Sequence, residues 1–301
     1  MAEGAWRGPG WWRAMDTAGR AALLLLAAMT AAVIVVPMLA PGDPLAIGEV
    51  LRARLVPPMS RDAAGAFHLL GTDRFGRDLF VRMMLGGRIS LAVGIAGSLL
   101  AAAVGTLAGA IAAWRGGIAD RAAMGAADLL LALPRLVLLL VCAALWRPGT
   151  LTVVVVLVAT GWMGVARLVR AELLGLRAEP WVDAATALGA SGWRVLWRHA
   201  LPNAMAPVIV ATTLGVGNAI LLESGLSFLG LGVQPPAPSW GNMIAGGREV
   251  IVTAPWVALG PGIALILTVL ACTLLGDTLR DELAGAPARR AVTPGGRERG
   301  R

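Results

Sequence analysis

The chain has 301 residues, of which 57% are apolar and 15% are charged, and its formal net charge at pH 7 is +8. All 26 basic residues are arginine, which excludes a phosphate-binding loop of the GxxxxGKS/T type, and they flank apolar runs instead of forming the basic, aromatic-interleaved domain of a nucleic-acid-binding protein. The two histidines lie far apart and both cysteines fall in apolar runs, so the sequence lacks the parts of a metal cluster, a disulfide framework or a Cys/His catalytic site.

The first apolar run covers residues 21–39 and predicts a transmembrane helix, because about 20 apolar residues cross the hydrocarbon core of a bilayer. Three arginines precede this run, so residues 1–20 are expected to form a cytoplasmic tail. A cleaved signal peptide is the alternative, but the run is long for such a peptide and Pro41 follows Ala40. Residues 40–88 form a polar segment that this topology places in the periplasm.

The second predicted span covers residues 89–114 and carries a ridge of small residues. Ala101, Gly105 and Gly109 are spaced four apart, so they lie on one face of a helix. Small residues in this arrangement let a neighbouring transmembrane helix approach closely. We therefore expect this ridge to serve helix packing.

The third predicted span, residues 128–146, has Pro134 and Arg135 near its start, where a guanidinium group can still reach the membrane interface. Only a tight turn separates it from the fourth span, residues 151–166. The polar loop that follows, residues 173–203, is therefore on the opposite side from that turn.

The fifth and sixth predicted spans cover residues 204–222 and 256–275. Residues 284–301 are rich in Gly and Arg and predict a disordered cytoplasmic tail. If the amino terminus lies in the cytoplasm, sixteen arginines fall in cytoplasmic stretches and nine fall on the outer side of the membrane. Arg135 is left within the membrane. Seven of those nine lie in the first outer segment, which weakens the charge signal without reversing it. The sequence thus predicts an all-α, polytopic membrane protein with six transmembrane helices and both termini in the cytoplasm.

The polar loop 173–203 contains two short amphipathic patterns. Trp181, Ala184, Ala185 and Leu188 have the i, i+3, i+4, i+7 spacing of one helical face. After a Gly-Ala-Ser-Gly stretch the spacing recurs in a second set of residues, which are Trp193, Leu196, Trp197, Ala200 and Leu201. Two short helices joined by a glycine turn are expected, either docking on a partner or lying on the lipid surface.

The order of residues in this loop resembles the EAA loop of permeases in binding-protein-dependent ABC importers. The matching residues are Asp183, Ala184, Ala185, Gly189, Leu201 and Pro202, with His199 two positions before Leu201. The family commonly has Glu at the first position and Ile at the place of His199. Asp183 keeps the negative charge near a helix amino terminus, where the backbone N–H groups favour it.

Further motifs are similar to the dipeptide, oligopeptide and nickel branch of this family, and to its C-type subunit. The likeness covers roughly residues 70–283 in one collinear order. It is carried by the stretches LGTDRFGRD (70–78), LSFLGLGVQPP (226–236), SWGNM (239–243) and LGDTLRD (275–281).

The resemblance implies the fold of a type I ABC importer permease, with a five-helix core within residues 89–283 and one N-terminal helix. In this family the EAA segment forms a coupling helix that sits in a groove of a cytoplasmic ATP-binding subunit. Trp193 and Trp197 are expected to pack the second helix of the loop back onto the permease. The residues expected to couple to the ATPase subunit are Asp183, Ala184, Ala185, Leu188, Gly189, Leu201 and Pro202.

The resemblance also implies partners and a location. The chain is expected to have no catalytic residue, metal or cofactor of its own, since ATP and Mg are used by partner subunits. Those partners are a second homologous permease, two cytoplasmic ATP-binding subunits and a periplasmic or lipid-anchored solute-binding protein. The expected location is the bacterial inner membrane, in contact with the lipid bilayer and with no nucleic acid.

Two outer segments, residues 71–78 and 226–240, are rich in Gly, Pro and single charges. This composition suits irregular backbone at a place where a solute-binding protein docks or an outer gate forms. Each segment could equally be a structural turn. Glu223, at the outer end of the fifth span, is expected to brace the outer loop and not to contact substrate. The candidate residues are Gly71, Asp73, Gly76, Arg77, Asp78, Glu223, Phe228 and Trp240.

Two other classes of protein fit the sequence less well. A secondary transporter or channel would need ionisable groups inside the spans and usually inverted repeats, and neither is evident. An integral membrane enzyme would need histidine and acidic clusters. The resemblance leaves the substrate open among dipeptides, longer peptides, glutathione-like thiols and nickel chelates.

Overall fold

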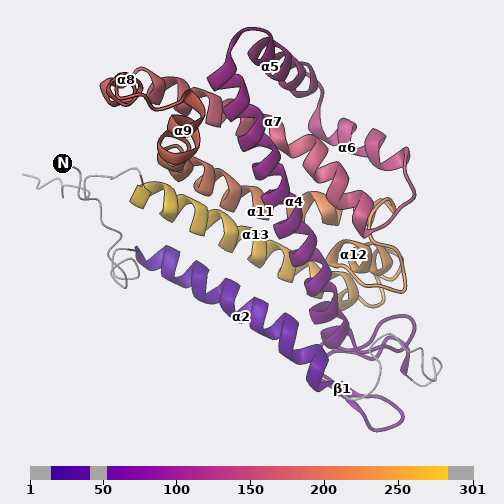
Figure 1. The fold of residues 1–301 in the computed structure, drawn as a ribbon. Coiled ribbons are helices and arrows are strands. Elements are labelled where there is room, and N and C mark those ends of the chain that lie inside the picture. The colour runs from indigo at the N-terminus through magenta and orange to yellow at the C-terminus, as the bar shows by residue number, and fades with distance from the viewer. Residues whose placement is uncertain (1–14, 41–52, 284–301) are drawn as a thin grey trace, which may run out of the picture.

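A computed structural model describes residues 15–40 and 53–283 of the chain (Figure 1). Five of the described helices are long and apolar enough to cross a membrane, or six if one bent pair forms a single span, which agrees with the predicted six-span architecture. The predicted tails and the first part of the polar segment, at residues 1–14, 41–52 and 284–301, lie outside the described residues. The main helices are α2 (Thr17–Leu39), α4 (Leu79–Arg115), α5 (Gly117–Leu131), α6 (Arg135–Ala144), α7 (Thr150–Arg177), α11 (Met205–Phe228), α12 (Trp240–Arg248) and α13 (Trp256–Leu283).

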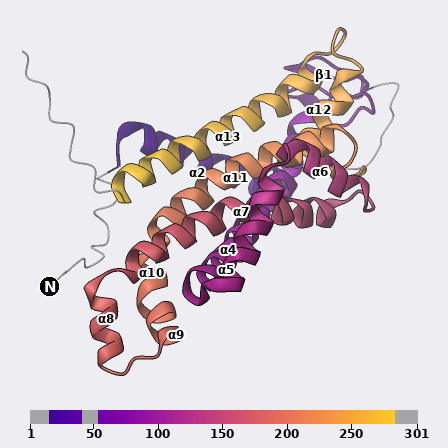
Figure 2. The ribbon, with the colours of Figure 1, turned by 90° about the horizontal axis from the view of Figure 1, so that it is seen from above.

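The helices form a bundle with two distinct ends. The first residues of α2, the end of α4 and the last residues of α13 lie at one end, together with the short helix α8 (Pro180–Ala187) (Figures 1 and 2). Helix α12 and the antiparallel pair β1 (Ser60–Arg61) and β2 (Phe67–His68) lie at the other. We refer to these as the α8 end and the α12 end.

Helix α4 begins ten residues earlier than the predicted span. Asp78 caps its amino terminus, because the carboxylate Oδ1 accepts a hydrogen bond of 2.9 Å from the backbone N–H of Val81. The predicted polar segment therefore ends at Asp78 and not at Arg88. At 37 residues, the helix is about 55 Å long and exceeds the roughly 30 Å hydrocarbon core.

The third predicted span, residues 128–146, is not one straight helix. Its sequence is divided between α5 and α6, which meet at an angle of 94°. Residues 117–131, which precede this predicted span and enter its first part, are helical. Pro134 lies at the break and supplies no backbone N–H, and a proline disfavours helical geometry in the residue before it.

Helix α7 continues eleven residues past the predicted end of the fourth span, so the loop 173–203 begins inside it. Two ion pairs join this extension to α5. The Arg170 guanidinium donates to Asp120 at 2.6 Å, and the Nε of Arg167 donates to Asp128 at 3.0 Å. Helix α13 likewise runs to Leu283 instead of ending near residue 275.

Close packing of α4 against α7 uses the ridge of small residues. A Cβ atom added to Gly105 would lie 2.5 Å from the carbonyl oxygen of Trp162, and one added to Gly109 would overlap the carbonyl oxygen of Ala166. On the facing helix, a Cβ at Gly161 would lie 2.9 Å from that of Ala101. The predicted packing role of the ridge is confirmed.

Helix α2 packs against α13 and α4 on one side of the bundle (Figure 1). Pro37 lies inside α2 and cannot donate to the carbonyl of Val33, four residues earlier. The Nε of Arg88 on α4 donates to that carbonyl at 2.8 Å, and its Nη2 donates to the carbonyl of Ile34 at 2.6 Å. The arginine thus satisfies an acceptor that the proline leaves without its helical partner.

Candidate functional site

The loop between α7 and α11 forms two helices joined by a turn, as its spacing predicts. The first is α8. The turn contains Gly189 with φ +87°, a left-handed conformation that glycine adopts without strain. The second helix is composite, with α9 (Gly192–Val195), a π-helical turn (Leu196–Ala200) and α10 (Leu201–Asn203).

One face of this helical pair is fixed to the bundle. Val182 is buried, and Leu196 and Ala200 lie fully buried in a cluster with residues of α4, α7 and α11. The rings of Trp181 and His199 meet edge to face at 6.4 Å, so His199 connects the two helices of the loop. The second helix is thus packed on α4, α7 and α11, and α8 contacts this cluster through Trp181.

Most of the remaining surface of α8, and the turn that follows it, is exposed. Leu188 is 89% exposed, and Asp183, Ala184 and Gly189 are also exposed, while Ala185 is half-buried. Leu188 therefore presents an uncovered apolar side chain at the end of α8. At the base of the pair, Leu201 is half-buried within the buried cluster and Pro202 is exposed.

The expected packing of Trp193 and Trp197 onto the permease is wrong. These side chains are 41% and 46% exposed, and Val195, Leu196 and Ala200 occupy the buried face instead. The guanidinium of Arg115, at the end of α4, lies 5.4 Å from the ring centroid of Trp193. The π-helical turn contributes to this difference, since i→i+5 bonding rotates the faces away from a regular 3.6-residue pattern.

At the α12 end, the predicted residues of the first outer segment form a tight turn around Asp73. This carboxylate accepts hydrogen bonds from the backbone N–H groups of Phe75 and Arg77 and from the Arg77 guanidinium, at 2.8 to 3.0 Å. Gly71 and Gly76 have φ of +78° and +74°. Asp78 accepts a 2.8 Å hydrogen bond from Nδ1 of His68, so it joins the β-hairpin to the start of α4.

Glu223 is completely buried and brings three serines together. Its carboxylate accepts hydrogen bonds from the hydroxyls of Ser90 at 2.9 Å, Ser227 at 2.7 Å and Ser224 at 3.3 Å. The Ser227 hydroxyl in turn accepts a bond from the backbone N–H of Val233. This geometry ties the end of α11 to α4 and to the loop that follows α11, and it agrees with the expected bracing role.

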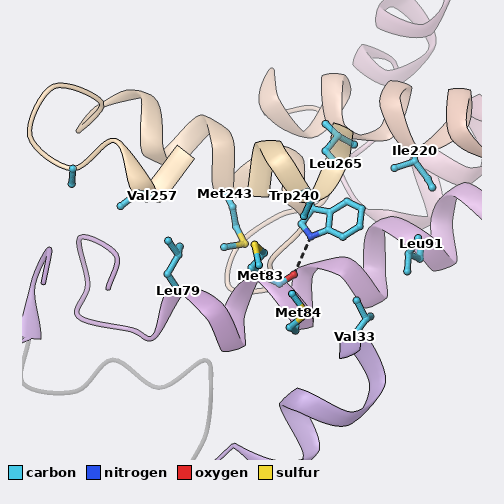
Figure 3. Close-up of a cluster of buried hydrophobic side chains, with 12 residues drawn as sticks. Val33, Leu79, Met83, Met84, Leu91, Ile220, Trp240, Met243, Val257 and Leu265 are labelled. Atoms are coloured by element: carbon cyan, nitrogen blue, oxygen red, sulfur yellow. Dashed lines mark hydrogen bonds between the residues drawn. The ribbon is translucent and has the colours of Figure 1, made fainter. Parts of the chain in front are cut away.

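Trp240, at the start of α12, completes this arrangement. Its backbone N–H donates to the Ser90 hydroxyl at 3.2 Å, and its indole N–H donates to the carbonyl of Met83 at 3.0 Å. Figure 3 shows the indole among apolar side chains of α4, α11 and α13, and the side chain is fully buried. Phe228 is half-buried under the guanidinium of Arg248, 5.7 Å from the ring centroid. Sequence reasoning did not single out Ser90 or Ser227, since serines in apolar helices carry no distinctive spacing.

A cavity of about 880 Å³ opens on the face formed by α4, α7, α11 and α13. The Ser98 hydroxyl donates to the carbonyl of Thr212 there, whereas the Thr212 hydroxyl bonds within its own helix. Asn218 is exposed on this face. The polar lining residues are Ser98, Arg135, Glu172, Thr212, Asn218, Thr273 and Arg280.

The family model of the binding-protein-dependent transport system inner membrane component matches residues 105–284 of this chain. The chain belongs to this family. A peptide permease protein of Brucella suis is 49% identical over 216 residues, which cover 71% of this chain and 72% of the relative. The glutathione transport system permease protein GsiD of Pectobacterium atrosepticum is 42% identical over 72% of each chain.

A longer match is to another Brucella suis protein named as a peptide transport system permease. It is 40% identical over 264 residues, covering 88% of this chain and 86% of the relative. In three dimensions, the fold is similar to a chain of the inward-facing MetNI methionine ABC transporter, with a TM-score of 0.55, 19% identity and coverage of 68% of this chain and 96% of that one.

These findings confirm the predicted family and the predicted fold. The chain is a multi-pass permease subunit of a binding-protein-dependent ABC importer of the inner membrane. The family assignment also decides against the alternative of a secondary transporter that works alone.

Proposed function

We propose that this permease carries peptides or small peptide-like solutes such as glutathione into the cell. The relatives named above, at 40% to 49% identity, are named as peptide or glutathione permeases. Peptides and glutathione share an amide backbone with a free carboxylate, so one class of solute accounts for all these names. A nickel chelate remains the competing substrate.

The exposed face of α8 is the observation that supports coupling to an ATPase subunit. Leu188 lies at the end of a helix whose Trp181 packs against the buried cluster and against His199. A helix packed in this way, with an uncovered apolar tip, suits a lever that seats in another protein's groove. Asp183, Ala184, Ala185, Leu188 and Gly189 are the proposed contact residues, with Leu201 and Pro202 at the base of the lever.

The proposed importer also contains partner subunits. We infer that ATP and Mg²⁺ are bound by two cytoplasmic ATP-binding subunits and that this chain has no ATPase site or cofactor of its own. A second, homologous permease would face the 880 Å³ cavity, so that each chain contributes half of the solute pathway. ATP-driven closure of the ATPase subunits would then move helix α8 of both permeases, and the pathway would open alternately to the two sides of the membrane.

The orientation proposed for the chain places the α8 end in the cytoplasm, together with both termini. A periplasmic or lipid-anchored solute-binding protein would dock at the α12 end. The turn around Asp73 and Arg77, with Gly71, Gly76 and Asp78, is fixed by hydrogen bonds and suits a docking surface. Glu223 and Trp240 hold the surrounding loops, and Phe228 lies beside them.

Purification from the native membrane in a mild detergent, followed by identification of the co-purifying proteins, tests this proposal. Recovery of a second permease and of ATP-binding subunits is expected. Reconstituted vesicles loaded with the binding protein should take up a labelled dipeptide or glutathione in an ATP-dependent manner. A chain that purifies alone under several mild conditions would contradict the proposed assembly, and uptake of a nickel chelate in place of peptides would contradict the proposed substrate class.

A further inference from the structure

A second cavity, of about 450 Å³, lies at the α12 end and shares no lining residue with the 880 Å³ cavity. Its apolar part includes Leu79, Met243 and Val257, which belong to the cluster around Trp240 (Figure 3). Its polar part is unusually basic and includes Asp73, Arg74, Arg77, Arg82 and Asn242. The volume falls within the range typical of pockets that bind small molecules.

Positive charge exceeds negative charge around this cavity. Arg77 makes two short contacts with Asp73 Oδ2, at 2.8 Å from Nε and 2.7 Å from Nη2. Arg82 reaches the same oxygen only at 3.5 Å. Arg74 pairs with the exposed Glu249, which does not line the cavity. Three guanidinium groups thus share two carboxylates, which leaves one positive charge without a negative partner within this group.

Arg82 is the residue that points to a ligand. Its side chain is 92% buried, because only 8% of it is exposed. Its Nη1 atom is buried and finds no hydrogen-bond acceptor among the described residues. A buried charged donor without an acceptor is destabilising by more than a neutral one. The protein therefore holds an unsatisfied charged donor on a residue that lines the cavity.

We propose that this cavity binds a carboxylate group. The planar guanidinium fork matches the two oxygens of a carboxylate, and Phe75 supports the neighbouring arginines, with Arg74 and Arg77 at 4.9 and 4.5 Å from its ring centroid. Arg82 holds the carboxylate, and Arg77 adds positive charge beside it while its Nε and Nη2 stay on Asp73. The apolar wall accommodates the carbon skeleton that carries the carboxylate. Two sources share this chemistry, the carboxyl terminus of a free peptide and an acidic side chain of a docked solute-binding protein. The choice between these two sources of the carboxylate rests on the proposed function. The binding of a carboxylate by this cavity does not rest on it.

Acetate is the simplest probe, and thermal unfolding of the purified chain in detergent is the readout. Acetate should raise the unfolding midpoint relative to chloride at equal ionic strength, by about 2 °C at a tenfold excess over its Kd. Arg82→Met should weaken acetate binding about 10- to 100-fold, because it removes a charged hydrogen-bond donor. Arg61→Gln is the matched control, since Arg61 lies in the neighbouring hairpin, bonds the carbonyl of Gly65 and does not line the cavity.

A second variant tests the site without removing charge. A side chain added at Gly246 meets no atom within 4 Å at its Cβ, and Gly246 lines the cavity, so Gly246→Phe should fill the space and abolish the acetate effect. Absence of an acetate effect in the wild type would overturn the proposal, as would an equal effect in the wild type and both cavity variants.

The two sources are then distinguished with Ala-Ala and its carboxyl-terminal amide. Binding of Ala-Ala more tightly than acetate, and loss of that binding in the amide, assigns the site to free peptides. Binding of Ala-Ala no tighter than acetate assigns it to a carboxylate presented by a docked protein. These measurements use neither ATP nor transport, so their failure would leave the proposed importer function standing.

Discussion

The Nε of Arg88 on α4 donates a 2.8 Å hydrogen bond to the carbonyl of Val33 on α2, which Pro37 leaves without its usual helical donor. This relationship joins the amino-terminal helix to the core. It is also a local compensation for a proline within a transmembrane segment, where no water can satisfy the freed carbonyl.

The pairing predicts a specific energetic coupling. Arg88→Met should reduce the free energy of unfolding by about 1–3 kcal/mol in the wild-type background. In a Pro37→Ala background the same change should have a smaller effect, because the alanine that replaces Pro37 supplies a backbone N–H to the Val33 carbonyl. The four proteins of this double-mutant cycle can be compared by thermal unfolding in detergent. Equal effects of Arg88→Met in the two backgrounds would contradict the compensation.

Glu223 should contribute strongly to the stability of the α12 end. Glu223→Ala removes the acceptor of three serine hydroxyls in a fully buried site, so a loss of about 2–4 kcal/mol is expected. Glu223→Gln keeps the shape and one acceptor oxygen and should have less than half of that effect. Asn218→Ala, at an exposed position on the same helix, is the control. Thermal unfolding that is unchanged in Glu223→Ala would exclude the bracing role.

Gly189 should be required for its backbone conformation and not for space. No atom lies within 4 Å of a Cβ added there, but its φ of +87° strains any L-residue. Gly189→Ala should reduce stability or shift the turn at a cost of about 1 kcal/mol. Gly175→Ala, in helix α7 with equally open space, should be neutral or slightly stabilising. Hydrogen exchange of the α8 amides measures both changes, and equal protection in the two variants would contradict the argument.

The β1–β2 hairpin should lose stability in acid. Burial of Asp62 opposes ionisation, but hydrogen bonds from the Ala66 and Ala64 backbone and from His68 favour the carboxylate, so the pKa of Asp62 lies below its ordinary value of 3.8. A lowered pKa in the folded state stabilises the protein above pH 3.8, and this contribution is lost as the pH falls through the folded-state pKa. Hydrogen-exchange protection of the Ala66 amide should therefore fall at acid pH in the wild type. Asp62→Asn should show weaker protection at neutral pH and little change in acid, and an identical profile in both proteins would exclude Asp62 as the cause.

The apolar runs predicted the number and order of the spans, because a helix must be apolar over about 20 residues to cross the bilayer. Their ends were predicted less well, since hydropathy does not register helices that continue into water. Helix α7 continues through Arg167 and Arg170, whose partners lie on α5. The break at Pro134 was visible as a proline, but the 94° bend depends on how α5 and α6 pack.

The coupling segment was predictable in outline and not in detail. The spacing around Trp181 and Trp193 predicted two helices. The buried face of the second helix depends on the π-helical turn, and no residue pattern in the sequence predicts such a turn. The contacts of Glu223 were also hidden, because Ser90 lies 133 residues away and only the packing of α4 against α11 brings it near.

The central claim, that α8 transmits the action of an ATPase subunit, is tested most directly by comparing a polar substitution at the exposed end of this helix with one at its buried position. Leu188→Ser changes a side chain that is 89% exposed and should alter stability by less than about 0.5 kcal/mol. Val182→Ser changes a buried side chain and should destabilise the helix by about 1–3 kcal/mol. The measurement is ATP-driven uptake by the reconstituted importer together with its rate of ATP hydrolysis. We predict that Leu188→Ser leaves the protein folded and inserted but reduces uptake at least tenfold or separates it from ATP hydrolysis. Normal, fully coupled uptake in Leu188→Ser would contradict the account.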